Sequence, residues 1–167
     1  MILLRRPVDA RQGLDFVAMT ETLLVIHVLS AVAWLGGGFF NGFIGPRMAK
    51  AGGETALNWI TNAIDAASRY FIPAGVLTLL SGIGLVLSDD AYDFSMAFVV
   101  IGLAVAVIAL ILAFSVLRPS AIKALAAMKA GDFPTVGINA NRAALTGRLI
   151  VILLVLTEIS MVLRIGA

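Results

Sequence analysis

Cysteine is absent from this chain of 167 residues, and His27 is its only histidine. Without cysteine the chain cannot form a disulfide, a thiolate metal site or a covalent c-type haem attachment. The net charge of +2 is too small to indicate nucleic acid as a partner, and only 13% of the residues are charged. There is no Ser/His/Asp triad and no metalloprotease helix, and the glycine run 36–38 lacks the context of a phosphate loop. Few polar side chains are therefore left to carry chemistry.

Apolar residues make up most of the chain. They account for 60% of it, and the mean hydropathy is +1.03. A soluble domain of this length cannot hide so much apolar surface, because its own surface has to be solvated. The lipid bilayer is thus the expected solvent and partner, and a multi-pass position in the bacterial cytoplasmic (inner) membrane is the expected location. The length predicts a single domain.

Four segments reach the length of about 20 residues that a helix needs to cross a bilayer. Within a membrane domain of residues 19–167 they cover about residues 20–45, 70–87, 94–117 and 146–165. Pro46-Arg47 is expected to end the first span and Arg118-Pro119 the third. An even number of spans with short connections predicts an all-α fold, a transmembrane antiparallel four-helix bundle.

Two connecting segments carry helical patterns of their own. In residues 55–68 the apolar side chains repeat at helical spacing after a break at Gly52-Gly53, and this helix is expected to run on into the second span. Residues 119–131 predict a short surface helix between the third and fourth spans, begun by Pro119 and closed by Gly131.

Lysine and arginine counts predict the orientation of the bundle. The connections after the first and third spans hold eight of these residues, whereas the opposite side holds four, three of them within residues 1–18. The positive-inside rule then places both termini outside the cell. Residues 1–18 lack the apolar core and cleavage site of a signal peptide. They are expected to form a short surface helix or to result from a wrongly assigned start codon, with Met19 as the true start.

His27 and Glu158 stand inside the predicted spans, where an ionisable group is costly and needs a partner. Each lies about seven residues from the outer end of its span, so the two share a depth if the spans are antiparallel. A carboxylate bound to one ring nitrogen would fix the tautomer of His27 and make the other nitrogen a better metal ligand. On its own helix His27 shares one stripe with Ser30, Ala31, Trp34 and Gly38.

His27 is therefore a candidate axial ligand for the iron of haem b. Small residues beside it would leave room for a flat macrocycle, although glycines serve close helix packing as well. The full candidate cofactor site comprises His27, Ser30, Trp34, Gly37, Gly38 and Glu158. The second axial ligand would come from His27 of a second copy or from a methionine of the outer half, namely Met19, Met96 or Met161.

Other roles for these groups stay open from the sequence. His27 can serve only as a hydrogen-bond partner of a neighbouring helix. Glu158 can likewise hold two helices together, or it can form a proton or cation site.

The spacing His27-x6-Trp34-x-Gly36-Gly37 resembles the first helix of a broad group of small bacterial membrane proteins. This group includes the copper-resistance D family, the HemJ-type protoporphyrinogen oxidases and an uncharacterised four-helix integral membrane family. In the oxidases a Pro-Arg pair follows the tryptophan closely, and the histidine works with a basic residue in a later helix. Here the Pro-Arg pair comes later in the chain, and no predicted span holds a lysine. The chain is thus most similar to the uncharacterised family. The resemblance implies a b-type haem or porphyrin site at His27.

Three functional hypotheses follow, and whether the protein is an enzyme stays open. The first is a haem-binding, redox-associated membrane protein that uses His27 with Glu158 beside it. The second is a non-catalytic accessory subunit of a larger membrane complex, or a homo-oligomer, in which the glycine faces are interfaces. The third is a small ion or copper transporter that uses Glu158. It ranks last because such apolar spans leave no polar path.

Overall fold

The computed structural model describes the backbone of residues 10–89 and 91–166 and the side chains from Val17 onward. Four long helical rods and no strand are found in this part of the chain. The first rod is α1 (Ala10–Ala51), and the second joins α2 (Gly53–Ala66), η1 (Ala67–Phe71) and α3 (Ile72–Ser88). The third joins α4 (Ala97–Leu112), η2 (Ala113–Leu117) and α5 (Arg118–Ala130), and the fourth is α6 (Phe133–Val162).

All four rods are longer than the expected spans, and the predicted helix ends at two prolines are wrong. Helix α1 continues through Pro46, and the third rod continues through Pro119. A proline removes one backbone hydrogen bond, but a long helix packed on its neighbours absorbs that loss without ending. The helix predicted over residues 119–131 is thus the end of the third rod. The run of the helix after Gly53 into the second span is confirmed.

The fourth rod begins 13 residues before the predicted span, at Phe133 instead of Thr146. Asp132 caps it by accepting a hydrogen bond from the Thr135 N–H at 3.2 Å, and Pro134 fits the first turn because its missing N–H would have no partner there. At the other end of the chain, residues 10–18 already belong to α1, and the rest of the predicted segment 1–18 lies outside the described residues.

Two π-helical turns interrupt the second and third rods, each just before a proline. The Ile72 N–H bonds to the Ala67 carbonyl in η1, and the Arg118 N–H bonds to the Ala113 carbonyl in η2. Since proline displaces the carbonyl four residues earlier, a wider turn accommodates Pro73 and Pro119 without breaking the rod.

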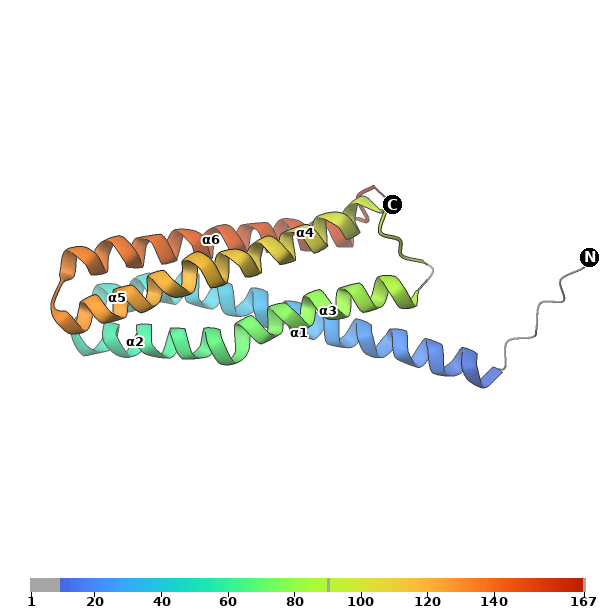
Figure 1. The fold of residues 1–167 in the computed structure, drawn as a ribbon, viewed down its shortest axis with the longest axis horizontal. Helices are drawn as coiled ribbons and strands as arrows, with labels where there is room; N and C mark the ends of the chain where they lie inside the picture. The colour runs from blue at the N-terminus through green and yellow to red at the C-terminus, as the bar shows by residue number, and fades with distance from the viewer. Residues whose placement is uncertain (1–9, 90, 167) are drawn as a thin grey trace, which may run out of the picture.

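The four rods lie side by side (Figure 1). Helix α1 packs against α3 and α6, and α4 also packs against α3 and α6, so the four helices form a closed ring. The turn at Gly52 and Gly53, both with positive φ, and the turn at Gly131 lie at one end of the molecule. The end of α6 lies at the opposite end, beside the connection between α3 and α4.

The core of the ring is built from small residues around one tryptophan. Trp34 lies against Gly75, where a Cβ atom would stand only 2.9 Å from the indole ring. Small residues let helices approach closely where no water drives them together. The buried cluster comprises Trp34, Ala74, Ala106, Ala109, Ala113, Ile150 and Leu154.

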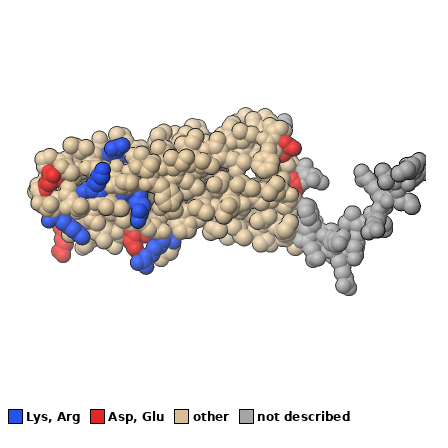
Figure 2. All heavy atoms as spheres, in the orientation of Figure 1, with Lys and Arg blue, Asp and Glu red and all other residues tan. Residues whose placement is uncertain are grey.

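The outside of the rods is apolar along the middle of the molecule, and charged side chains lie toward both ends (Figure 2). Figure 2 shows lysine and arginine side chains gathered over the half of the molecule that holds the two glycine turns and none over the visible face of the other half. Each rod contains a stretch apolar enough to cross a membrane, and the helices concerned are 30 to 36 residues long. The basic residues at this end are Arg47, Lys50, Arg69, Arg118, Lys123, Lys129, Arg142 and Arg148.

Candidate functional site

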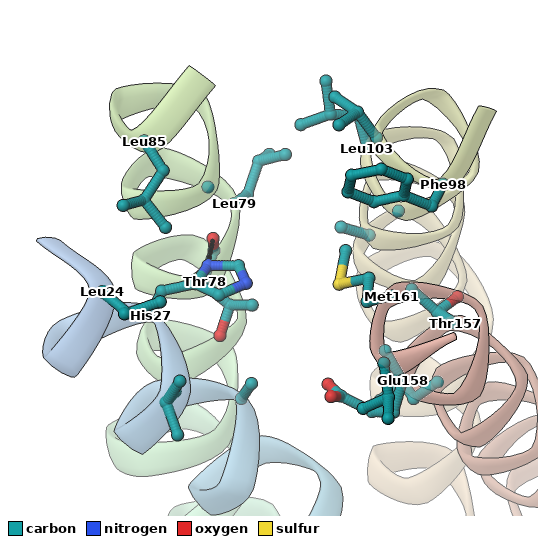
Figure 3. Close-up of a pocket in the computed structure, with 18 of the residues that line it drawn as sticks. Leu24, His27, Thr78, Leu79, Leu85, Phe98, Leu103, Thr157, Glu158 and Met161 are labelled. Carbon is teal, nitrogen blue, oxygen red and sulfur yellow. Dashed lines mark hydrogen bonds between the residues drawn. The ribbon is translucent and has the colours of Figure 1, made fainter. Parts of the chain in front are cut away.

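A cavity of about 320 Å³ lies between the α1–α3 pair and the α4–α6 pair, in the half of the molecule away from the basic residues. Figure 3 shows side chains from both pairs facing each other across it. Its walls are mostly aliphatic and aromatic, and a few polar groups converge on it. These polar groups are His27, Thr78, Tyr92, Thr157, Glu158 and Arg164.

His27 enters the cavity from α1 and is held against α3. Its Nδ1 lies 2.9 Å from the carbonyl oxygen of Thr78 and 3.3 Å from the hydroxyl of Ser81. A carbonyl only accepts hydrogen bonds, so Nδ1 carries the proton, and the lone pair of the neutral ring is on Nε2. That edge of the ring faces the cavity in Figure 3. A ring held in this way by a backbone carbonyl is the usual arrangement of a metal-binding histidine.

The wall behind His27 is shaped to receive the ring. A Cβ atom on Gly82 would stand 3.1 Å from the ring carbon Cε1, so glycine leaves the space that the imidazole fills. The Thr78 hydroxyl donates a hydrogen bond to Ser30 Oγ at 3.0 Å, which ties α3 to α1 one turn from His27. The orientation of His27 is thus set by two helices rather than by its own rotamer alone.

Helix α6 supplies the opposite wall. Glu158 and Met161 both extend toward His27 in Figure 3, and Met161 packs over Gly102 of α4, where a Cβ atom would collide with its terminal methyl group. His27 and Glu158 both line this cavity. Within the described residues, however, no hydrogen bond or ion pair joins the two side chains, so the predicted direct pairing is not made.

Of the remaining predicted site residues, Trp34 lines the cavity and the others do not. Trp34 lines its inner end, and Ser30 is buried behind His27. At Gly37 and Gly38 the neighbouring space is already filled: the Phe71 ring packs on Gly37, and a Cβ atom on Gly38 would meet Val151 at 2.7 Å. These two glycines therefore serve helix packing, which leaves no clearance for a macrocycle beside them.

Met161 is the main residue that the sequence did not single out. The sequence offers three methionines at about the right depth, and the signal that distinguishes Met161 is its spacing of three residues from Glu158, since residues i and i+3 share a helix face. Thr78 holds the His27 ring through its backbone oxygen, which no side-chain pattern can indicate.

His27 and Met161 are the lining residues that could hold a metal-centred group. One imidazole nitrogen is available on one wall and a thioether sulfur on the other, and His/Met is a known axial pair for haem iron. No group of three His, Cys, Asp or Glu side chains converges anywhere in the described residues. Comparison with known proteins yields no family model, no curated protein and no solved structure that matches this chain.

Proposed function

We propose that this protein is an antiparallel transmembrane four-helix bundle of the bacterial cytoplasmic membrane, with both termini outside, that binds haem b in its outer half. Helices of 30 to 36 residues are roughly 45 to 54 Å long, whereas the hydrocarbon core of a bilayer is about 30 Å thick. The excess length carries the basic residues, which suits a cytoplasmic projection by the positive-inside rule. The cavity then lies at membrane depth.

The available Nε2 of His27 is the observation that carries the haem proposal. His27 and Met161 would hold the iron from opposite walls, and the aliphatic lining would cover the ring. A bound haem b supplies one-electron transfer. The chain itself holds the imidazole in one tautomer through the Thr78 carbonyl and keeps water from the cavity with its apolar walls.

The visible spectrum of the purified protein tests this proposal. The chain is produced in cells supplied with a haem precursor and is purified in mild detergent. We expect a Soret band that is lost in His27→Ala and retained in Ser115→Ala, an exposed serine that is absent from the cavity lining. A colourless wild-type protein that also fails to bind added haemin would refute the haem role.

The accessory-subunit hypothesis has one observation in its favour. Gly36 and Gly42 of α1 have open space beside them, and the exposed rings of Phe39, Phe40 and Phe43 surround them. Such a face suits another membrane helix as well as lipid. Recovery of the chain in a larger assembly in gentle detergent, lost on Gly36→Leu or Gly42→Leu, would favour this role. A chain that stays monomeric at all concentrations tested would exclude it.

A further inference from the structure

Arg164 closes helix α6 in a backbone conformation that arginine rarely adopts. Its φ angle is +47°, and it is the one non-glycine residue with positive φ in the described part of the chain. Its N–H bonds to the Met161 carbonyl at 3.2 Å, and the next N–H, that of Ile165, bonds to the Ser160 carbonyl at 3.1 Å. This is the left-handed position of a helix C-terminal motif that glycine normally occupies. A strained residue of this kind is a reason to look for a function.

The position of Arg164 beside the cavity indicates a role in binding. Its side chain lines the cavity together with aliphatic residues such as Val162 and Leu24, and it follows the end of α6 at one end of the molecule (Figure 1). Among the described residues it makes no ion pair and no side-chain hydrogen bond, since the ion pair found there joins Arg69 to Asp65. A guanidinium group at the mouth of an apolar cavity presents a paired set of donors that matches a carboxylate.

We propose that Arg164 is the carboxylate subsite of this cavity, so that its ligand is an amphiphile whose acid group lies at the mouth and whose apolar body extends toward His27. This inference rests on the proposed function, because it assigns the propionate groups of the haem to Arg164. Arg164 follows Met161 by three residues, roughly 4.5 Å along a helix axis, so the acid group and the ring would occupy successive levels of the cavity.

The other polar groups of the cavity agree with this direction. Arg164 is the one lysine or arginine among the described residues that line the cavity, so a ligand carboxylate is attracted to that position. The other polar side chains that line the cavity are His27, Thr78, Tyr92, Thr157 and Glu158. An anion thus has one favourable place in the cavity.

The test compares metal-free protoporphyrin with its dimethyl ester, which has the same ring and no carboxylate. Binding to the full chain in detergent is measured by porphyrin fluorescence. We expect the wild type to bind the free acid about tenfold more tightly than the ester, the size of a charge-assisted hydrogen bond. Arg164→Gly should reduce this preference to less than about twofold and leave the ester affinity unchanged, whereas Arg164→Lys should keep part of it.

Arg164→Gly also separates binding from folding. Glycine adopts positive φ without strain, so this variant should melt at the same temperature as the wild type or higher while it loses the preference for the acid. Arg148→Gln, at the basic end far from the cavity, is the matched control and should keep the full preference. A wild type that binds acid and ester equally overturns the inference.

The same measurement separates this inference from the haem proposal. Metal-free porphyrin needs no axial ligand, so His27→Ala should retain the preference for the acid. Equal binding of acid and ester together with a normal Soret band would overturn the role of Arg164 and leave the haem site intact. A preference for the acid in a protein that does not ligate haem iron would overturn the haem proposal and leave the role of Arg164 intact. Failure of both metal-free porphyrins to bind overturns the role of Arg164, and failure of haemin to bind as well overturns both proposals.

Discussion

At the scale of single residues, the tautomer of His27 is the central feature. A backbone carbonyl cannot be removed by mutation, so the contact that fixes the tautomer has to be tested through the space around the ring. Gly82 provides this space, because any side chain there would meet the imidazole edge. The orientation of His27 thus depends on a residue that has no functional group.

Gly82→Ala is expected to weaken haem binding about tenfold, the lower end of the effect of losing a supporting contact at a metal ligand. The added methyl group would stand 3.1 Å from Cε1 of His27 and displace the ring from the Thr78 carbonyl. Affinity is measured by titrating the apoprotein with haemin and following the Soret band. Gly84→Ala is the control, because its methyl group meets only Leu23, at 3.2 Å. Equal affinities for the two variants would show that the position of the ring does not matter.

The cap of α6 predicts a pH dependence. Hydrogen bonding by the side chain and the backbone N–H of Thr135 holds the pKa of Asp132 below its ordinary value of 3.8. The charged cap therefore stabilises the folded state above that value, and this contribution is lost as the pH falls through the lowered pKa. Asp132→Asn keeps a capping side chain that does not titrate. The melting temperature of the wild type should exceed that of the variant near pH 6, and the difference should shrink toward about pH 3. A difference that does not change with pH contradicts this account.

At the scale of the helices, the glycines of α1 divide into two kinds. Gly37 and Gly38 are in contact with Phe71 and Val151 of the neighbouring rods, whereas Gly36 and Gly42 have open space beside them. One sequence run thus contains both packing positions and surface positions. The sequence alone cannot separate them, because the division depends on where the other helices lie.

Gly37→Ala and Gly38→Ala are expected to destabilise the protein by about 1 to 3 kcal/mol each, the usual cost of overpacking. Gly36→Ala and Gly42→Ala should leave stability unchanged or raise it by up to about 1 kcal/mol, because alanine is the better helix former. Thermal unfolding in detergent, followed by circular dichroism, measures all four. The same loss at all four positions would contradict the observed packing.

The sequence predicts the helices better than their ends. Hydropathy predicts the four long apolar helices, because about 20 apolar residues in a row are typical of a helix that can cross a membrane. It misplaces the ends at Pro46 and Pro119, since whether a proline ends a helix depends on the packing around it. Asp132 and Pro134 form a start signal for the fourth rod. Polar residues follow them, so a search for apolar residues places the start of the helix too late.

The candidate site, like the fold, can be predicted from the sequence only in part. The shared depth of His27 and Glu158 follows from counting residues in neighbouring antiparallel spans, and the structure brings them to one cavity. The roles of Met161 and Gly82 do not follow, because they depend on which helix faces meet. Which faces meet depends on the rotation of each helix about its own axis. This rotation is set by many small packing contacts, which a single sequence does not display.

At the scale of the whole molecule, orientation in the membrane can be read with single cysteines, because the natural chain has none. Ser95, in the connection between α3 and α4, and Ala130, at the end of α5, are both exposed. Ser95→Cys should react with a membrane-impermeant maleimide in intact spheroplasts, whereas Ala130→Cys should react only after the membrane is opened. The opposite pattern would invert the proposed orientation.

The central claim is that His27 and Met161 hold one haem iron between two helix pairs. The most direct test is the absorption spectrum of the ferric protein, in which a methionine sulfur bound to iron produces a weak charge-transfer band in the far red. We predict that the wild type shows this band together with a Soret band, that Met161→Leu loses the far-red band and keeps the Soret band, and that His27→Ala loses both. A wild type without haem, or a Met161→Leu variant whose far-red band is unchanged, would contradict the account.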